Sequence, residues 1–143
     1  MRAVLDTSVL VAAVRSRTGA SSLLLEAALK AQFPFLISTA LVLEYEAVLT
    51  RPENLAAAGL TTSEVGELLD ALCDAGIQVQ LTRRLRPRLR DPDDEMVMET
   101  AVNGDATAIV TFNRGDFAEV PAEFGIDVLA PSEALKKMRM MIR

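Results

Sequence analysis

The stretch VLDTSVLVAA, residues 4–13, interrupts an apolar run with a carboxylate at Asp6. The apolar residues on either side predict a short buried strand at 2–5 and a helix at 8–15. Burying a carboxylate between two such segments costs free energy unless something compensates it. Asp6 is either the N-cap of the helix or a functional group at the carboxyl end of the strand. Because the two hydroxyl residues that follow it could cap the helix equally well, we favour the second interpretation.

Strands and helices alternate through the rest of the chain. Further strands are predicted at 33–38, 77–81, 107–112 and 126–130, and further helices at 20–31, 39–50, 61–75, 91–102 and from Ser132 onward. Ser21 or Ser22 is expected to cap the second helix, and Gly76 to end the helix at 61–75. This order predicts one α/β domain over residues 1–143, with helices on both faces of a mainly parallel sheet. Ligands of such sheets bind at the carboxyl ends of the strands, near the point where strand order reverses.

The composition excludes several kinds of chemistry. The chain has no histidine, so Ser-His-Asp catalysis, Cys-His catalysis and His-ligated zinc are ruled out. The net charge of −5 argues against a protein that coats duplex nucleic acid by charge alone. The single cysteine, Cys73, reads as a small core residue. With no disulfide framework, no signal-peptide pattern and no apolar run near the ~20 residues of a membrane span, we expect a cytoplasmic protein without membrane contact.

Two acidic residues fall on helix faces that should be buried. In the helix at 39–50, Glu44 flanks the apolar stripe, whereas Glu46 points away from it. Glu44 is either a rim residue that reaches solvent or a functional group. In the helix at 91–102, Asp94 lies near the middle of the apolar face. Acids favour any helix N-terminus, but the position of Asp94 on the apolar face favours a function.

Further polar residues follow the strand predicted at 107–112. Asn113 and Asp116 stand in the segment TFNRGDF and, taken singly, are ordinary turn residues. If the strands are parallel, Asp6, Glu44, Asp94 and this segment could meet at one edge of the sheet. Converging carboxylates repel each other unless a cation neutralises them. The constellation therefore implies a bound divalent metal ion.

Four segments together resemble a known family. They are VLDTSVL at 4–10, ISTALVLEYEAVL at 37–49, DPDDEMVMETAV at 91–102 and IVTFNRGDF at 109–117. Their order and spacing resemble a PIN domain, and in particular the PIN-family (VapC-like) toxins of toxin–antitoxin pairs. The resemblance implies a small α/β/α sandwich, and a ribonuclease that depends on Mg²⁺ or Mn²⁺. It also implies a homodimer and a cognate antitoxin that holds the activity in check.

Carried over by position, the resemblance places the catalytic acids at Asp6, Glu44 and Asp94, with Asp116 or Asn113 at the fourth position. Asp6, Asp94 and Asp116 would hold the metal, and Glu44 would orient a water molecule or help to bind the ion. Asn113 cannot supply a charge, so the number of metal ions, one or two, stays open. Supporting polar positions fall on Thr7, Ser8, Thr111 and Asn113. The reaction implied is hydrolysis of an RNA phosphodiester by a water whose pKa the metal lowers.

The run RRLRPRLR at 83–90 has three interpretations: a solvated loop or edge strand, a binding site for RNA phosphates, or a contact for an acidic antitoxin tail. Two other classes of α/β protein also place an Asp at the end of the first strand. A phosphatase of the haloacid-dehalogenase type needs Asp-x-Asp, and a receiver domain needs a pair of acids after the first strand. Neither is present around Asp6. A PIN-like binding module without catalytic activity is the remaining alternative.

Overall fold

A computed structural model describes residues 1–82, 92–117 and 124–141 of the chain. The arginine run at 83–90 and Asp91 lie outside the described residues, as does the 118–123 segment. Within the described part, no helix is long and apolar enough to cross a membrane.

The strands are short and run parallel to one another. They are β1 (Ala3–Leu5), β2 (Leu36–Ile37), β3 (Ile77–Gln78), β4 (Ala108–Val110) and β5 (Asp127–Leu129). β4 pairs with both β1 and β5, and β2 pairs with β3. A parallel bridge between Ala3 and Phe35 connects the two groups of strands. The spatial order is therefore β3-β2-β1-β4-β5.

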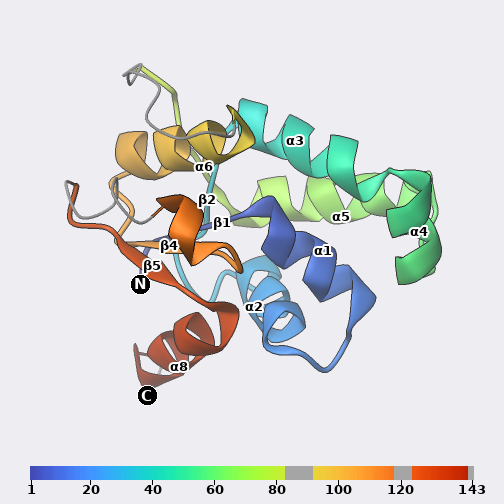
Figure 1. Cartoon of the computed structure of the whole chain (residues 1–143), viewed down its shortest axis with the longest axis horizontal. Helices are drawn as coiled ribbons and strands as arrows, with labels where there is room; N and C mark the ends of the chain where they lie inside the picture. Colours follow the sequence, from blue (N-terminus) through green and yellow to red (C-terminus); the bar gives the residue numbers. More distant parts are fainter. Residues whose placement is uncertain (83–91, 118–123, 142–143) are drawn as a thin grey trace.

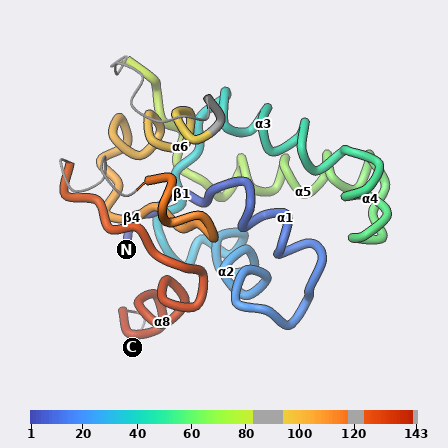
Figure 2. Tube along the Cα trace, in the orientation of Figure 1, coloured from blue at the N-terminus to red at the C-terminus, as the bar shows by residue number. Residues whose placement is uncertain are grey.

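Helices cover both sides of these strands, which confirms the predicted α/β/α arrangement. The helices are α1 (Thr7–Arg15), α2 (Ala20–Leu29), α3 (Thr39–Leu49), α4 (Pro52–Ala58), α5 (Thr62–Ala75), α6 (Pro92–Asn103) and α8 (Pro131–Met141), with a 3-10 turn η1 (Arg114–Phe117). α6 packs on β1, β2 and β4 on one side, and α2 and α8 lie together on the other (Figure 1). The pair α3 and α5 extends away from the strands beside α1 (Figure 2).

The central strands are apolar because both of their faces are covered. All residues of β1, β2 and β4 are buried, and α6 contributes Val97, Met98 and Ala101 to the same core. Strands that are buried on both faces are expected to read as continuous apolar runs rather than alternating ones. Packing in this core therefore fixes the position of the carboxyl end of each strand, and with it the position of the residue that follows.

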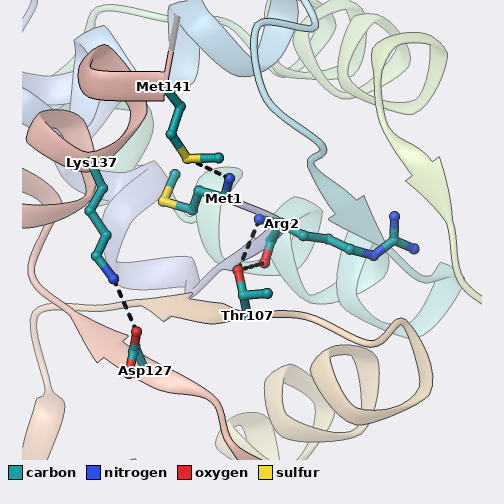
Figure 3. A network of polar contacts seen from close by, with 6 residues as sticks. All are labelled: Met1, Arg2, Thr107, Asp127, Lys137 and Met141. Carbon is teal, nitrogen blue, oxygen red and sulfur yellow. Dashed lines mark hydrogen bonds and ion pairs between the residues drawn. The ribbon is translucent and has the colours of Figure 1, made fainter.

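Contacts at the amino ends of the strands link the start of β1 to β4, and β5 to α8 (Figure 3). The Arg2 backbone N–H donates to Thr107 Oγ1 at 3.0 Å, which links the starts of β1 and β4. Lys137 of α8 pairs with Asp127 of β5 at 3.0 Å. The N-terminal ammonium lies 2.8 Å from the sulfur of Met141, so the two ends of the described chain meet here.

Several local predictions need correction. α4 was not predicted, although Pro52 at its first position is a common helix start. The N-cap of α2 is Gly19. Ser21 is buried inside the helix and does not cap it, contrary to the prediction. α8 begins at Pro131, so Ser132 lies within the helix, and the Glu133 side chain accepts the Ala130 N–H instead.

Candidate functional site

The strand order reverses between β1 and β4. From β1 the chain moves outward through β2 to β3, and it returns to the other side of β1 to form β4 and β5. Ligands bind at the carboxyl ends of parallel strands near such a reversal. Leu5 pairs with Val110 in the parallel register, so Asp6 and Thr111 follow neighbouring strand ends.

Asp6 is a buried carboxylate that two hydroxyl groups hold in place. Its side chain is only 6% exposed. Oδ2 accepts one hydrogen bond from Thr111 Oγ1 at 2.7 Å and another from Ser8 Oγ at 2.8 Å. The Asp6 backbone N–H donates to the Val110 carbonyl at 2.9 Å. The carboxylate is thus fixed against the end of β4, a strand that lies more than a hundred residues away in sequence.

The backbone of Asp6 occupies the N-cap position of α1, but its side chain does not cap the helix. The φ and ψ angles of −64° and 150° are those of an N-cap, and no capping hydrogen bond forms. Neither Thr7 nor Ser8, which could have capped the helix in its place, does so. Ser8 donates to Asp6, and Thr7 Oγ1 is buried with no hydrogen-bond partner in the described part of the chain. The carboxylate is directed away from the helix start, toward β4.

The loop after β4 is hydrogen-bonded to the same two hydroxyls, those of Ser8 and Thr111. Thr111 Oγ1 donates to Asp6 and accepts the Asn113 backbone N–H at 2.9 Å. The Phe112 N–H donates to Ser8 Oγ at 3.5 Å. The two hydroxyls that hold Asp6 therefore each donate to its carboxylate and accept a backbone N–H from this loop.

Tyr45 supports the strand end from α3. Its hydroxyl, which is fully buried, donates to the carbonyl of Leu5, the residue before Asp6. Burial raises the pKa of Tyr45 well above its usual value, and the nearby negative charge of Asp6 raises it further. In the sequence Tyr45 reads as one residue of the apolar stripe that Glu44 flanks, and the signal of its role is the one polar atom on that stripe.

Glu44 and Asp94 lie on the helices that flank this strand end. Glu44 precedes Tyr45 and is half-buried, whereas Glu46 is exposed as predicted. Asp94 is 8% exposed, which confirms that it lies on the buried side of α6. Because α6 leads into β4, its first turn, which contains Asp94, is at the carboxyl edge of the sheet.

A second pair of hydroxyls, which the sequence analysis did not single out, connects α3 to α6. Ser38 follows β2 directly, and its Oγ lies 2.8 Å from Thr100 Oγ1 of α6. Ser38 Oγ also accepts the Leu41 N–H at 3.3 Å and so caps α3. The signal in the sequence was a serine placed between a strand and a helix. This contact sets the relative position of the two helices that bear Glu44 and Asp94.

The candidates for the fourth position lie at the surface. Asn113 is exposed, and Asp116 is exposed within η1, where its backbone N–H donates to the Asn113 carbonyl at 3.0 Å. Phe117, at the end of this turn, is fully buried and anchors it to the core. The structure thus places Asp116 on an anchored turn beyond the end of β4, and gives it no buried environment like that of Asp6.

The donor chemistry fits a hard cation. Carboxylate and hydroxyl oxygens, without histidine or cysteine, are the ligands that Mg²⁺ and Mn²⁺ prefer. Both described hydrogen bonds to the Asp6 side chain fall on Oδ2, and the Thr7 hydroxyl beside it is unsatisfied. Across residues 1–82, 92–117 and 124–141, no three acidic or cysteine side chains form a ready-made ligand group. The structure brings together Asp6, Ser8 and Thr111 from the predicted set.

The comparisons with known proteins point to one family. A family model described as a PIN domain matches residues 2–115, which include Asp6, Glu44, Asp94 and Thr111 and end just before Asp116. No curated protein matches the chain. No solved structure matches it either. Because the family match covers most of the chain and the α/β arrangement agrees with it, this protein belongs to the PIN-domain family.

Proposed function

We propose that this protein is a metal-dependent ribonuclease that hydrolyses phosphodiester bonds of RNA. PIN domains are generally nucleases and generally use divalent metal ions. The observation that carries the proposal is the buried Asp6 carboxylate at the strand-order reversal, with both described hydrogen bonds on one oxygen. A carboxylate that hydroxyl groups orient in this way is a suitable ligand for a hard cation.

In this proposal Asp6, Asp94 and Asp116 hold Mg²⁺ or Mn²⁺. When bound, the ion supplies a Lewis acid that neutralises phosphate charge and lowers the pKa of water. Glu44, half-buried beside Tyr45, orients the water or adds to the ion's ligands. Thr7, Ser8, Thr111 and Asn113 play the supporting roles.

The residues of the chain contribute orientation and charge. Ser8 and Thr111 fix the plane of the Asp6 carboxylate, and charged acceptors form stronger hydrogen bonds than neutral ones. Tyr45 fixes the strand end on which Asp6 stands. With no histidine in the chain, a carboxylate is the natural proton acceptor for an attacking water.

The wider role we propose is that of the toxin in a toxin–antitoxin pair. This rests on the VapC-like resemblance of the four segments, and it implies a cognate antitoxin and a homodimer. Strong expression of the protein should slow bacterial growth, and co-expression of a small protein encoded beside it should relieve the effect. Unchanged growth with abundant folded protein would count against the toxin role but not against nuclease activity.

Cleavage of a labelled RNA by purified protein tests the proposed activity. Wild type should cleave with Mg²⁺ or Mn²⁺ and stop when EDTA is added. Asp6→Asn should lose activity by orders of magnitude, while Glu46→Gln, an exposed carboxylate on the outer side of α3, should retain it.

Equal losses in Asp6→Asn and Glu46→Gln would refute the site assignment. A folded wild-type protein that cleaves no RNA with either ion would instead identify a PIN-like binding module. Thermal melts of each variant establish that a loss of activity is not a loss of fold.

A further inference from the structure

We propose that a pocket between the N-terminal ends of α2 and α8 binds an unpaired base of the RNA, with Phe112 as its stacking surface. The inference rests on the proposed ribonuclease function and names part of its substrate. It assigns a binding role to residues outside the predicted catalytic set.

The pocket has a volume of about 280 Å³ and is formed by small residues and one aromatic ring. Its lining includes Ser16, Gly19, Ser21, Phe112, Pro131 and Ser132. These come from the end of α1, the start of α2, the loop after β4 and the start of α8. Mostly apolar walls with a few polar groups are typical of a site for a small organic group.

The pocket adjoins the candidate catalytic site. Phe112 follows Thr111, whose hydroxyl donates to Asp6. The Phe112 backbone N–H donates to Ser8 Oγ at 3.5 Å, and Ser8 in turn donates to Asp6. The ring is therefore carried by a backbone that the Asp6 cluster holds. A nucleotide chain with one phosphate at Asp6 would have an adjacent base within reach of this ring.

Phe112 is an exposed aromatic ring, with 55% of its surface accessible. Its neighbours in the sequence are buried instead: Thr111 before it is fully buried, and Phe117 after it is buried and anchors η1. Sequence-specific proteins recognise single-stranded RNA by stacking splayed-out bases on such rings. An exposed ring fixed at the edge of a nuclease site is suited to that role.

The polar groups of the pocket favour a neutral base over a phosphate. In the part of the chain that the structure describes, no lysine or arginine lines it. Three serines do line it, and a hydroxyl both donates and accepts, as the edge of a base requires. Ser21 is only 4% exposed, and its Oγ has no hydrogen-bond partner in the described part of the chain. A base edge would supply the missing partner, because an unsatisfied buried hydroxyl is unfavourable.

Fluorescence of 2-aminopurine, placed at each position in turn of a short single-stranded RNA, tests the proposal. Titrations are run in EDTA and again with Ca²⁺ in place of Mg²⁺, so that binding is measured apart from cleavage. One position should be quenched on binding. Phe112→Ala should abolish that quenching and weaken affinity by about 10-fold, and Phe112→Trp should restore both.

Leu43→Ala is the matched control, since Leu43 is 59% exposed on α3 and does not line the pocket. It should leave the quenching and the affinity unchanged. Ser21→Ala should weaken binding of the RNA but not of the same RNA with the quenched base removed.

Three results would overturn the inference: no quenched position in either buffer, equal quenching in wild type and Phe112→Ala, or equal affinity for RNA lacking the base. Equal affinity for RNA lacking the base would indicate instead that the pocket binds an apolar side chain of a protein partner. Because these measurements need no cleavage, stacking that persists in a protein without nuclease activity supports the pocket and refutes the proposed function separately.

Discussion

Among the described residues, Asp6 is held by neutral donors and not by a basic side chain. Its two described side-chain contacts are the hydroxyls of Ser8 and Thr111. None of the ion pairs among the described residues includes it; they join exposed groups such as Lys30 and Glu26. At the scale of single residues, this arrangement supports the proposed cation site.

Replacing Thr111 with valine tests the hydrogen bonds of the hydroxyl separately from the packing of the side chain. Thr111→Val keeps the buried shape but leaves Asp6 Oδ2 without one donor, so unfolding should become easier by about 1–3 kcal/mol. RNA cleavage should fall as well, because the carboxylate loses its orientation. Thr111→Ser keeps the oxygen and should preserve most of the activity. Denaturant melts and cleavage rates measure both effects, and a valine variant with full activity would contradict the positioning role.

Tyr45 offers a test by pH, because its pKa is raised by burial and by the charge of Asp6. A group whose folded pKa lies above its unfolded value stabilises the fold below the unfolded pKa. That stability is lost as the pH rises from about 10. The free energy of unfolding of wild type should therefore decline in this alkaline range more steeply than that of Tyr45→Phe.

Tyr45 is the only tyrosine and the chain has no tryptophan, so ultraviolet absorbance of tyrosinate reports this residue alone. The folded protein should show no tyrosinate until it unfolds in alkali. Titration of the folded protein near pH 10 would contradict a buried hydroxyl bound to Leu5.

At the scale of elements, two glycines give opposite predictions. Gly66 lies inside α5 with open space where a Cβ would stand, so Gly66→Ala should stabilise the protein by about 0.5–1 kcal/mol. At Gly104, just after α6, a Cβ would meet side-chain atoms of Leu36 and Val79, both at 2.8 Å. Gly104→Ala should therefore destabilise the fold by about 1–3 kcal/mol, as overpacking of a core does.

Chemical denaturation of the two alanine variants checks this pair, with wild type as the reference. Both changes add the same methyl group, but only at Gly104 does it meet Leu36 of β2 and Val79, the residue after β3. Equal stability of the two variants would show that the contact at Gly104 relaxes at no cost.

The two ends of α5 lie close to where the sequence placed them. Thr61 and Glu64 form a complete capping box at its start. Gly76 does end α5, but with a φ of −83° that any residue can adopt. Glycine is favoured at this position for a steric reason, since a Cβ would lie 3.1 Å from Ile37 Cδ1. The sequence thus located the end of the helix and missed the reason.

At the scale of the whole molecule, metal binding should appear as stability. An ion that binds only the folded state stabilises it by about 2.7 kcal/mol at a hundredfold excess over its Kd. Mn²⁺ should therefore raise the melting temperature of wild type. If Asp94 is one of the carboxylates of the proposed metal site, Asp94→Asn removes a like charge from that site, so the variant should melt higher than wild type in EDTA and gain less from Mn²⁺.

Glu46→Gln is the control in this series and should follow wild type in both buffers. The opposite result is informative: an acid that merely favours a helix N-terminus would stabilise α6. A lower melting temperature for Asp94→Asn in EDTA, together with a full Mn²⁺ shift, would remove Asp94 from the metal site.

The sequence by itself determined the α/β order, the buried faces of α3 and α6, and the position of Asp6 at the end of the first strand. These follow from periodicity and from local residue preferences, which act over a few residues. Only the tertiary structure decided that β4 lies beside β1, so that Thr111 reaches Asp6 across 105 residues of sequence. It also decided that the Tyr45 hydroxyl meets Leu5 and that Ser38 meets Thr100. No local pattern specifies these pairs, because strand order is set by the packing of all the helices on the sheet.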